Sequence, residues 1–484
     1  MSHRKLWELV ALAAVLALIL AGCPAPTPQL VEVEKPVVVE KEVVKTVEVE
    51  KLIVVTPTPE PGEAEPEPHP ITLTWWDFPR SSTAGEQTQP WGEELIALFE
   101  AEHPEVSVEL ELLEWASGWQ KIQAAAAADE LPDLSYMDMA NIGTYVLEDA
   151  VEPVEDYLTE EDWEDFYPHL LDYCSFEGRL YAWPLLEIAF GLMVNKTIAE
   201  ERGVAGMLPS PTGEWTHDQF LEFAKAVTHQ KEDGSKVYAI QIHPRTPPWF
   251  WFDDNPWYSE DGMYFILNNP SAVESLQLMT DLVNVHEVAF MATGQTTLNF
   301  YNGEAVIQFT RPSPVEAVTA QLAKNEEETG VKIEPAFVPP PVPNAVDDPH
   351  GYYGVGGIVV YKHQRDADPY RTKMAMEFAR MIVTAEPTMA YLYQFGYLPT
   401  RESWAVMYED DPYMAMAYYL RGKSYDLGQC GPCANNRNIT AAEVEAALTL
   451  QKTPEQALID MQKQIEPRMD EWRAQIKAWR EEQR

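Results

Sequence analysis

The fold is decided between residues 71 and 137, which read ITLTWWDFPRSSTAGEQTQPWGEELIALFEAEHPEVSVELELLEWASGWQKIQAAAAADELPDLSYM. Short runs of alternating or apolar residues favour strands, while apolar residues at helical spacing or rich in alanine favour helices. His103-Pro104 ends the first helical stretch. The expected order is strand 71–76, helix 93–102, strand 106–110, helix 120–128 and strand 132–137. Strands that alternate with helices are typical of a parallel α/β sheet.

The composition limits the class of protein. At about 150 residues per domain, the 484 residues of the chain allow two or three domains. Hydrophobic residues make up 46% and charged residues 23%, as in a protein with a large core. Acidic residues outnumber basic ones by 78 to 34, and the net charge is −44. Because nucleic acid and anionic lipid attract positive charge, we expect no nucleic-acid partner and no adhesion to a lipid surface through charge.

The N-terminus has the features of an export signal. Within residues 1–22, Arg4 and Lys5 precede an apolar run over 9–20 that is too short to span a bilayer of about 30 Å. The run ends in LAGC at Cys23, which resembles the bacterial lipoprotein box. We therefore expect Cys23 to carry lipid and to hold the protein on the outer face of the cell membrane through that anchor alone. Ordinary secretion with an incidental cysteine is the alternative.

A stalk is expected after the anchor, so that residues 23–70 contribute no core. The sequence VEVEK at 31–35 recurs at 47–51, and each copy is followed by a valine-rich run. Residues 56–70 alternate proline with threonine, glutamate and histidine, a composition that favours extended chain.

From Ile71 onward, short motifs occur in a fixed order. They are Pro132-Asp133, Gly178-Arg179-Leu180-Tyr181-Ala182-Trp183-Pro184, Val194-Asn195-Lys196, Trp215-Thr216-His217-Asp218-Gln219-Phe220, Asn302-Gly303-Glu304-Ala305 and Leu398-Pro399. In this order they resemble the extracellular solute-binding proteins of carbohydrate-type ABC importers, over about residues 71–470. Two motifs depart from the family pattern, with Val194 in place of tyrosine and with threonine and tryptophan exchanged at 215–216.

The resemblance implies a two-lobed α/β fold of the periplasmic-binding-protein type, with a hinge and a ligand cleft between the lobes. The expected bounds are residues 71–186 with 356–405 for lobe 1, and residues 187–355 with 406–484 for lobe 2. Residues 187–195 and 352–361 are the expected crossings, and the glycines between 351 and 357 are expected to let the second crossing flex. The resemblance further implies a monomer that needs no cofactor. It would deliver a small solute, expected to be a carbohydrate, to ABC permease subunits.

Candidate binding residues follow from the chemistry of sugars. Aromatic rings cover the C–H faces of a sugar, while carboxylates, amides and guanidinium groups bind its hydroxyls. We therefore selected tryptophan and tyrosine near polar residues at the expected strand ends and crossings. The candidate ligand-binding residues are Trp76, Asp77, Trp115, Trp119, Asp138, Glu187, Trp251, Asp254, Arg311 and Tyr353.

Structural alternatives stand beside several of these candidates. Strand alternation puts one of Trp75 and Trp76 in the core, and a tryptophan at 115 or 119 could pack under a helix. Asp138 could cap a helix, and Arg311 could form a structural ion pair. The stretch 249–257 holds three tryptophans and two aspartates, and we expect it to form a ligand wall of lobe 2 through Trp251. Strand or turn geometry should not point Trp249 and Trp257 into the same cleft.

Cys430-Gly431-Pro432-Cys433 matches the active-site motif of thioredoxins, in which the motif opens a helix that lowers the thiol pKa. The polar run Asn435–Asn438 that follows favours a loop instead. We therefore expect a short structural disulfide between Cys430 and Cys433, and a free, buried Cys174.

Motifs of catalysis are missing from the sequence. It contains no His-Glu-x-x-His, Gly-x-Ser-x-Gly, Walker or dinucleotide-binding motif, and its ten histidines show no metal-ligand spacing. We expect no catalytic residue and no metal site. Two alternatives to a sugar receptor stay open: a binding protein for another solute, such as a peptide or polyamine, and a glycoside-active enzyme with paired carboxylates.

Overall fold

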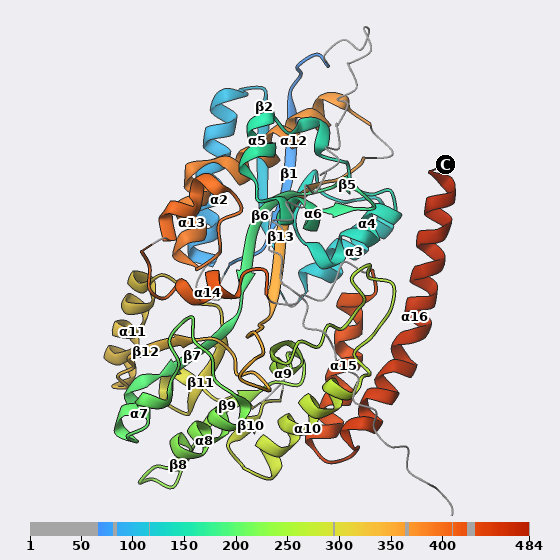
Figure 1. The fold of residues 1–484 in the computed structure, drawn as a ribbon. Helices are drawn as coiled ribbons and strands as arrows, with labels where there is room; N and C mark the ends of the chain where they lie inside the picture. The colour runs from blue at the N-terminus through green and yellow to red at the C-terminus, as the bar shows by residue number, and fades with distance from the viewer. Residues whose placement is uncertain are drawn as a thin grey trace, which may run out of the picture. The chain divides into compact units, whose positions relative to one another are not determined.

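The computed structural model describes residues 66–80, 85–115, 117–293, 296–363, 367–408, 410–423 and 431–483 (Figure 1). The expected signal, lipidated Cys23 and most of the stalk lie outside these residues, as does Cys430. The side chain of Trp251 is also outside the description.

Strands and helices alternate along most of the described chain. The strands are β1 (Ile71–Asp77), β2 (Val106–Leu112), β3 (Leu134–Asp138), β4 (Ser175–Phe176), β5 (Arg179–Leu180), β6 (Trp183–Ala189), β7 (Gly191–Asn195), β8 (His229–Gln230), β9 (Lys236–Ile242), β10 (Ala289–Met291), β11 (Ala305–Thr310), β12 (Pro335–Val338) and β13 (Tyr353–Val360). The α-helices are α2 (Gly85–Glu102), α3 (Gly118–Ala128), α4 (Ile142–Leu147), α5 (Glu160–Asp165), α6 (Pro168–Tyr173), α7 (Lys196–Glu201), α8 (His217–Val227), α9 (Pro248–Phe252), α10 (Pro270–Asn284), α11 (Val315–Thr329), α12 (Pro369–Thr384), α13 (Glu386–Gln394), α14 (Ala415–Leu420), α15 (Cys433–Leu448) and α16 (Pro454–Glu482). Short 3₁₀ helices are η1 (Met139–Asn141), η2 (Glu155–Tyr157), η3 (Ala205–Met207), η4 (Phe300–Asn302) and η5 (Glu402–Tyr408).

The first sheet has five strands in the order β2-β1-β3-β13-β6. β1 is parallel to β2 and β3, whereas β13 is antiparallel to β3 and β6. Alternation along β1 buries Trp75 completely, where its ring meets Trp91 of α2 and Phe378 of α12 edge-on at 5.5 and 5.4 Å. The predicted strand–helix–strand–helix–strand order over 71–137 is confirmed, and α12 and α2 cover this sheet.

The second sheet has six strands, β10-β9-β11-β7-β12 with β8 beside β9. β9, β10 and β11 are mutually parallel, and β7 and β12 are antiparallel to their neighbours. α8 packs on β9, and its first turn is closed by a capping box between Thr216 and Gln219. Buried phenylalanines at 220 and 223 give this helix its inward face.

Two chain segments connect the sheets. β6 passes into β7 through Phe190, whose backbone N–H donates to the carbonyl of Tyr352, at 2.8 Å, just before β13. Three of the glycines expected to give the second crossing its flexibility instead lie inside β13, which is hydrogen-bonded on both sides. A Cβ on Gly356 would lie 2.3 Å from the Tyr136 hydroxyl. This glycine therefore serves close packing against Tyr136, and the flexibility of the second crossing stays a prediction.

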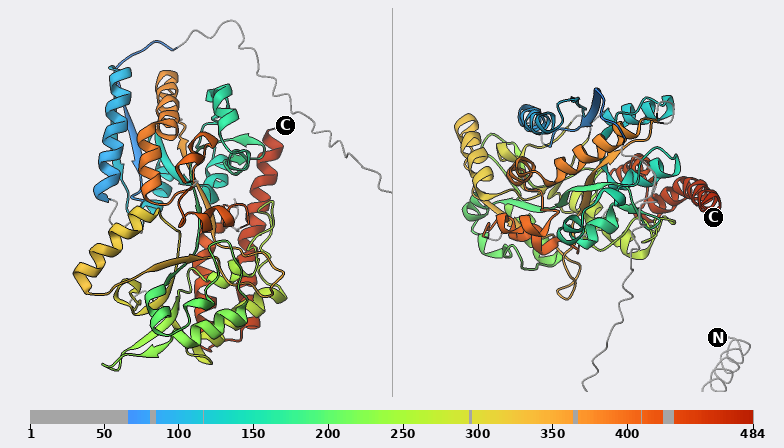
Figure 2. Two further views of the ribbon diagram at one scale, coloured as in Figure 1. Left: turned by 60° about the vertical axis from the view of Figure 1, so that its left-hand side comes forward. Right: turned by 90° about the horizontal axis from the view of Figure 1, so that it is seen from above.

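The C-terminal helices α15 and α16 run side by side (Figures 1 and 2) and pack on α10. α15 also contacts η1, and α16 contacts α4, so both helices reach elements that follow β3. The expected loop after the Cys-Gly-Pro-Cys motif is wrong, because α15 begins at Cys433 and runs for 16 residues. None of the described helices combines the length and the apolar character needed to cross a membrane.

Candidate functional site

The carboxyl ends of the parallel strands point to one candidate region. β1, β3 and β6 of the first sheet end at Asp77, Asp138 and Ala189, and β9, β10 and β11 of the second sheet end at Ile242, Met291 and Thr310. The chain enters the second sheet directly after β6, at the end of β7 that pairs with Thr310. Both carboxyl edges therefore adjoin the same crossing. Open α/β sheets bind their ligands outside the carboxyl ends of the strands.

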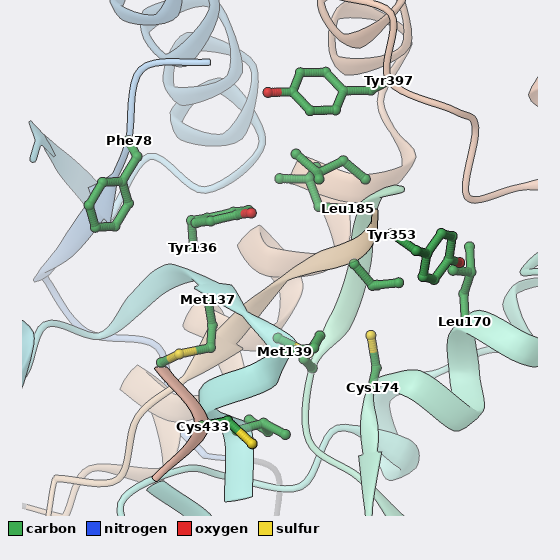
Figure 3. Packing of buried hydrophobic residues seen from close by; sticks show 14 of the residues in the cluster. Phe78, Tyr136, Met137, Met139, Leu170, Cys174, Leu185, Tyr353, Tyr397 and Cys433 are labelled. Atoms are coloured by element: carbon green, nitrogen blue, oxygen red, sulfur yellow. The ribbon is translucent and has the colours of Figure 1, made fainter. Parts of the chain in front are cut away.

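An aromatic cluster stands at the carboxyl edge of the first sheet. The Phe78 ring stacks on Trp119 at 4.7 Å and meets Trp115 at 4.6 Å, and Trp115 contacts Tyr136 edge-on at 6.0 Å. The indole N–H of Trp115 donates to the Pro79 carbonyl at 2.5 Å, yet 46% of the residue is exposed. Trp115 is thus a fixed ring open to solvent, whereas Phe78 and Tyr136 belong to the buried cluster (Figure 3).

Trp76 and Asp77 do not join this cluster. Trp76 is half-buried, and the Lys121 ammonium lies 4.1 Å from its ring centre. Asp77 is wholly buried, forms an ion pair with Arg80 at 2.7 Å and accepts the Phe78 backbone N–H at 2.7 Å. Because Arg80 and Phe78 already occupy its oxygens, Asp77 is closed to a ligand in this structure, and the binding role predicted for it needs correction.

Asp138 lies at the end of β3 and faces a residue that the sequence reading missed. Its carboxylate caps η1 by accepting the Ala140 N–H at 3.4 Å, so the helix-cap alternative holds. Burial raises the pKa of Asp138, and the positive charge of Arg437 opposes that rise. Arg437 of α15 donates to the Tyr352 hydroxyl at 3.3 Å, and within the described residues no ion pair joins it to Asp138. Arg437 therefore acts on Asp138 through its charge, without a direct ion pair between the two side chains.

Glu187 and Tyr353 come together, but as buried partners. The Tyr353 hydroxyl donates to Glu187 Oε1 at 2.7 Å, and Arg421 forms an ion pair with Glu187 Oε2. His169 lies 3.4 Å from Oε1. Since the Glu187 side chain is wholly buried and Tyr353 is only 4% exposed, neither reaches solvent here. The predicted ligand contacts of both residues are corrected to a structural network beside the first crossing.

Arg311 connects segments that follow strands of different sheets. Its Nε donates to the Phe395 carbonyl at 2.7 Å and its Nη2 donates to the Arg80 carbonyl at 3.1 Å. The guanidinium also lies 4.4 Å from the Tyr397 ring centre. Arg311 therefore joins the segment after β11 to those after β1 and α13 through backbone acceptors, rather than through the ion pair considered as its alternative.

The tryptophan-rich stretch 249–257 is mainly core. Trp249 and Trp257 are at most 1% exposed, and Trp249 packs edge-on against Phe220 of α8 at 5.3 Å. The burial of these two rings agrees with the expectation that the three tryptophans do not all face the cleft. The wall role of Trp251 stays a prediction. Asp254 is exposed and has a positive φ of 56°. The structure does not describe where the Trp251 side chain points.

A groove of about 310 Å³ runs along β9 and β11. Amide, hydroxyl and imidazole groups and three aromatic rings line much of it: Gln241, His243, Thr246, Thr297, Asn299, Phe300, Tyr301, Gln308 and Phe309. Gln241 accepts the Leu298 N–H at 2.5 Å, whereas Gln308 Oε1 is buried with no hydrogen-bond partner in the described chain. The size is at the lower end of ligand pockets, and the unpaired oxygen offers an acceptor to a ligand hydroxyl.

Other features are less suited to a solute site. A larger hollow of about 770 Å³ lies between α2 and α13 and not at strand ends. In the part of the chain that is described, no group of three metal-ligating side chains could hold an ion. Cys433 is disulfide-bonded and Cys174 is free and buried. The pairing of Cys433 with Cys430 stays a prediction because Cys430 is not described.

Comparisons with known proteins identify the family and the fold. The sequence model of the family described as bacterial extracellular solute-binding protein matches residues 94–416. The chain therefore belongs to this family, which implies a location outside the cytoplasm. Curated relatives from Brucella abortus and Brucella suis are 26% identical over 129 residues, and the match spans 27% of this chain and 30% of their length.

Solved structures show the same two-lobed fold. An ABC substrate-binding protein from Listeria monocytogenes in complex with cycloalternan has a TM-score of 0.66 at 18% identity, covering 82% of this chain and 99% of its own. A solute-binding protein from Thermotoga lettingae with α-D-tagatose has a TM-score of 0.65 at 18% identity and the same coverage. The sugar-binding protein MalE from Xanthomonas citri has a TM-score of 0.63 at 17% identity, covering 84% and 99%.

Proposed function

We propose that the protein is an extracytoplasmic receptor that captures a sugar or oligosaccharide and delivers it to an ABC permease. The observation that carries the proposal is the open Trp115 ring at the carboxyl edge of the first sheet, fixed by Phe78 and Trp119. It contacts Tyr136 of β3, the strand that ends at Asp138, where the charge of Arg437 acts. An aromatic face with a carboxylate and a guanidinium matches the C–H and hydroxyl faces of a sugar. The sugars bound by the Listeria and Thermotoga proteins support the same class of solute.

Binding would draw on both lobes. The Trp115 face would cover a sugar ring, while Asp138 accepts and Arg437 donates hydrogen bonds, each charged contact contributing about 1.5–3 kcal/mol. Gln308 and Asn299 in the groove of the second sheet would receive further hydroxyls. A ligand that contacts both sheets stabilises the conformation in which these groups lie close together. Only a ligand that binds two conformations with different affinity shifts the equilibrium between them. The lobe bounds given above remain part of this proposal.

A binding role is favoured over hydrolysis by the state of the carboxylates. Glycoside hydrolysis needs two carboxyl groups about 5–9.5 Å apart on either side of the bond. At the carboxyl edge of the first sheet, Asp77 is held by Arg80 and Glu187 by Arg421, both wholly buried. Asp138 is then left without an accessible partner among these strand-end carboxylates, so the bound sugar should be released unchanged.

A cationic solute is disfavoured by the same residues. A polyamine requires several carboxylates without opposing charge, whereas Arg437 is placed where it would repel an ammonium group. A peptide would gain from a free sheet edge, and the candidate residues lie at strand ends instead. We therefore propose a neutral, hydroxyl-rich solute.

Attachment to the membrane is a further part of the proposal and rests on sequence alone. Cys23 would carry lipid, and residues 24–70 would hold the binding part away from the membrane. The Cys23→Ser variant should appear in the soluble fraction while binding solute as the parent does. Membrane retention of that variant after washing in high salt would contradict the anchor.

The experiment that tests the solute class is thermal unfolding against a panel of mono- and oligosaccharides, with peptides and polyamines as matched sets. A ligand at 100 times its Kd adds about 2.7 kcal/mol to the free energy of unfolding. We expect at least one carbohydrate to raise the Tm and none of the peptides or polyamines to do so. Stabilisation by a peptide or polyamine alone would overturn the sugar assignment.

A further inference from the structure

Two aromatic residues lie where the chain passes between the two sheets. Phe190 separates β6 from β7, and Tyr352 directly precedes β13. The Phe190 N–H donates to the Tyr352 carbonyl at 2.8 Å, and the two rings meet edge-on with their centres 5.5 Å apart. Both residues are partly exposed, although the residues on either side of each are buried. The junction of the sheets therefore presents aromatic surface.

Phe309 continues this aromatic surface into the second sheet. Its ring centre lies 5.2 Å from that of Phe190, and the two planes are inclined by 31°. Phe309 belongs to β11, is partly exposed and lines the groove of about 310 Å³ along β9 and β11. We call Phe309, Phe190 and Tyr352 the junction strip. One end of the junction strip thus borders the groove in which Gln308 Oε1 has no hydrogen-bond partner within the described chain.

The other end of the junction strip reaches charged groups beside the first sheet. The Tyr352 hydroxyl accepts a hydrogen bond from Arg437 at 3.3 Å. The charge of Arg437 in turn acts on Asp138, the last residue of β3. Ring contacts therefore connect two sets of polar groups that belong to different sheets: the amides of the groove and the charges of Asp138 and Arg437.

This order of groups bears on the length of the solute. A single sugar ring is of similar width to the spacing between neighbouring rings of the junction strip, so it contacts the polar groups at one end only. Linked sugars present a row of C–H faces and hydroxyls, which suits aromatic rings flanked by polar groups. The groove alone is at the lower end of the size of ligand pockets.

We propose that the solute is an oligosaccharide of two or more linked sugars and that the junction strip selects it by length, an inference that rests on the proposed function. One sugar occupies the groove of the second sheet, and the next lies on Phe190 and Tyr352. Hydroxyls at the far end bond to Asp138 and Arg437. A monosaccharide fills only one of these places and is bound more weakly.

Matched sugar series test this length selection by titration calorimetry. The series are D-glucose with maltose and maltotriose, D-xylose with xylobiose and xylotriose, and D-mannose with mannobiose and mannotriose. Any other oligosaccharide that the panel selects is compared with its own monosaccharides. We expect the Kd of the bound oligosaccharide to be about tenfold or more below that of the monosaccharide. A monosaccharide bound as tightly as its oligomers would overturn the inference and leave the proposed function standing, whereas binding of no carbohydrate would fail the proposed function itself.

Variants separate length selection from a role in folding. Phe190→Leu and Phe309→Leu keep an apolar side chain and remove the ring face. We expect each to raise the Kd of the oligosaccharide about tenfold and that of the monosaccharide by less, so that the preference for length shrinks.

Phe290→Leu is the matched control for these variants. Phe290 is a partly exposed residue of β10 in the same sheet, and its ring meets Tyr238 edge-on at 5.5 Å. This control should keep the preference of the parent. Thermal unfolding identifies any variant that does not fold, in which case the other strip variant decides. An unchanged preference in the folded strip variants, or an equal loss in Phe290→Leu, would overturn the inference.

Discussion

Trp115 presents a large exposed ring next to a buried aromatic cluster. It is 46% exposed although its indole N–H is already paired with Pro79. We expect Trp115→Ala to weaken sugar binding by about 1–3 kcal/mol, the scale of an aromatic contact in a binding site. The free energy of unfolding should change little. As a matched control, Trp75→Ala removes a wholly buried ring and should cost about 3–5 kcal/mol of stability. Titration calorimetry measures the affinity of the Trp115→Ala variant, and urea unfolding measures the stability of both variants. Normal affinity in Trp115→Ala would contradict a binding role for this ring.

Asp133 gives a residue-level prediction for pH. Burial tends to raise its pKa, but hydrogen bonds from His363 and Arg371 and from the Thr74 N–H bring it down to about 2. Because this value lies below that of the unfolded chain, the carboxylate stabilises the fold fully above about pH 4, and the contribution is lost as the pH falls towards 2. Asp133→Asn should lower the free energy of unfolding at pH 7 by roughly 2 kcal/mol. Urea unfolding should show the gap between parent and variant closing below pH 4; a gap independent of pH would contradict the ionised state.

At the scale of elements, the contact between the segments after β11 and after α13 depends on Gly396. Its φ is +70°, and a Cβ there would lie 2.0 Å from the Pro312 carbonyl, beside the Arg311–Phe395 hydrogen bond. Gly396→Ala should therefore lower stability by about 1–3 kcal/mol and weaken solute binding, because the segments must separate. Gly234→Ala is the matched control, with a φ of +85° and no atom within 4 Å of its Cβ. Equal losses of Tm in the two variants would show that the close approach does not matter.

Elements with strong local patterns could be predicted from the sequence, and pairings between distant segments could not. Alternation and apolar spacing over 71–137 predicted the order of β1, α2, β2, α3 and β3. The start of α15 was missed because Asn435–Asn438 favours a turn locally, whereas packing on η1 and the buried, hydrogen-bonded Asn436 favour the helix. For the same reason Arg437 was not identified as a site residue.

The candidate site shows the same limit. Residue type and position made Trp115 and Asp138 candidates for ligand binding. A list of aromatic and acidic residues, however, does not distinguish an exposed side chain from a buried one. Asp77 and Glu187 were predicted to bind ligand, and distant or neighbouring arginines bury them in ion pairs. Trp249 and Trp257 are core, whereas the ligand wall predicted for Trp251 stays a prediction.

For the molecule as a whole, we expect a receptor that binds its solute and releases it chemically unchanged. Incubation of the protein with the selected oligosaccharide should return it intact, with stoichiometric binding and no turnover. The reason is that the buried strand-end carboxylates Asp77 and Glu187 are neutralised by arginines. Chromatography of the recovered sugar checks this, and the appearance of shorter products would move the protein to the glycoside-active class.

The most direct test of the central claim is a crystal structure of the protein with the carbohydrate that the panel selects. We expect a sugar ring on the exposed face of Trp115, with hydroxyls hydrogen-bonded to Asp138 and Arg437 and with contacts to groups at the strand ends of the second sheet. A sugar bound elsewhere, for example between α2 and α13, with Trp115 and Arg437 untouched, would contradict it.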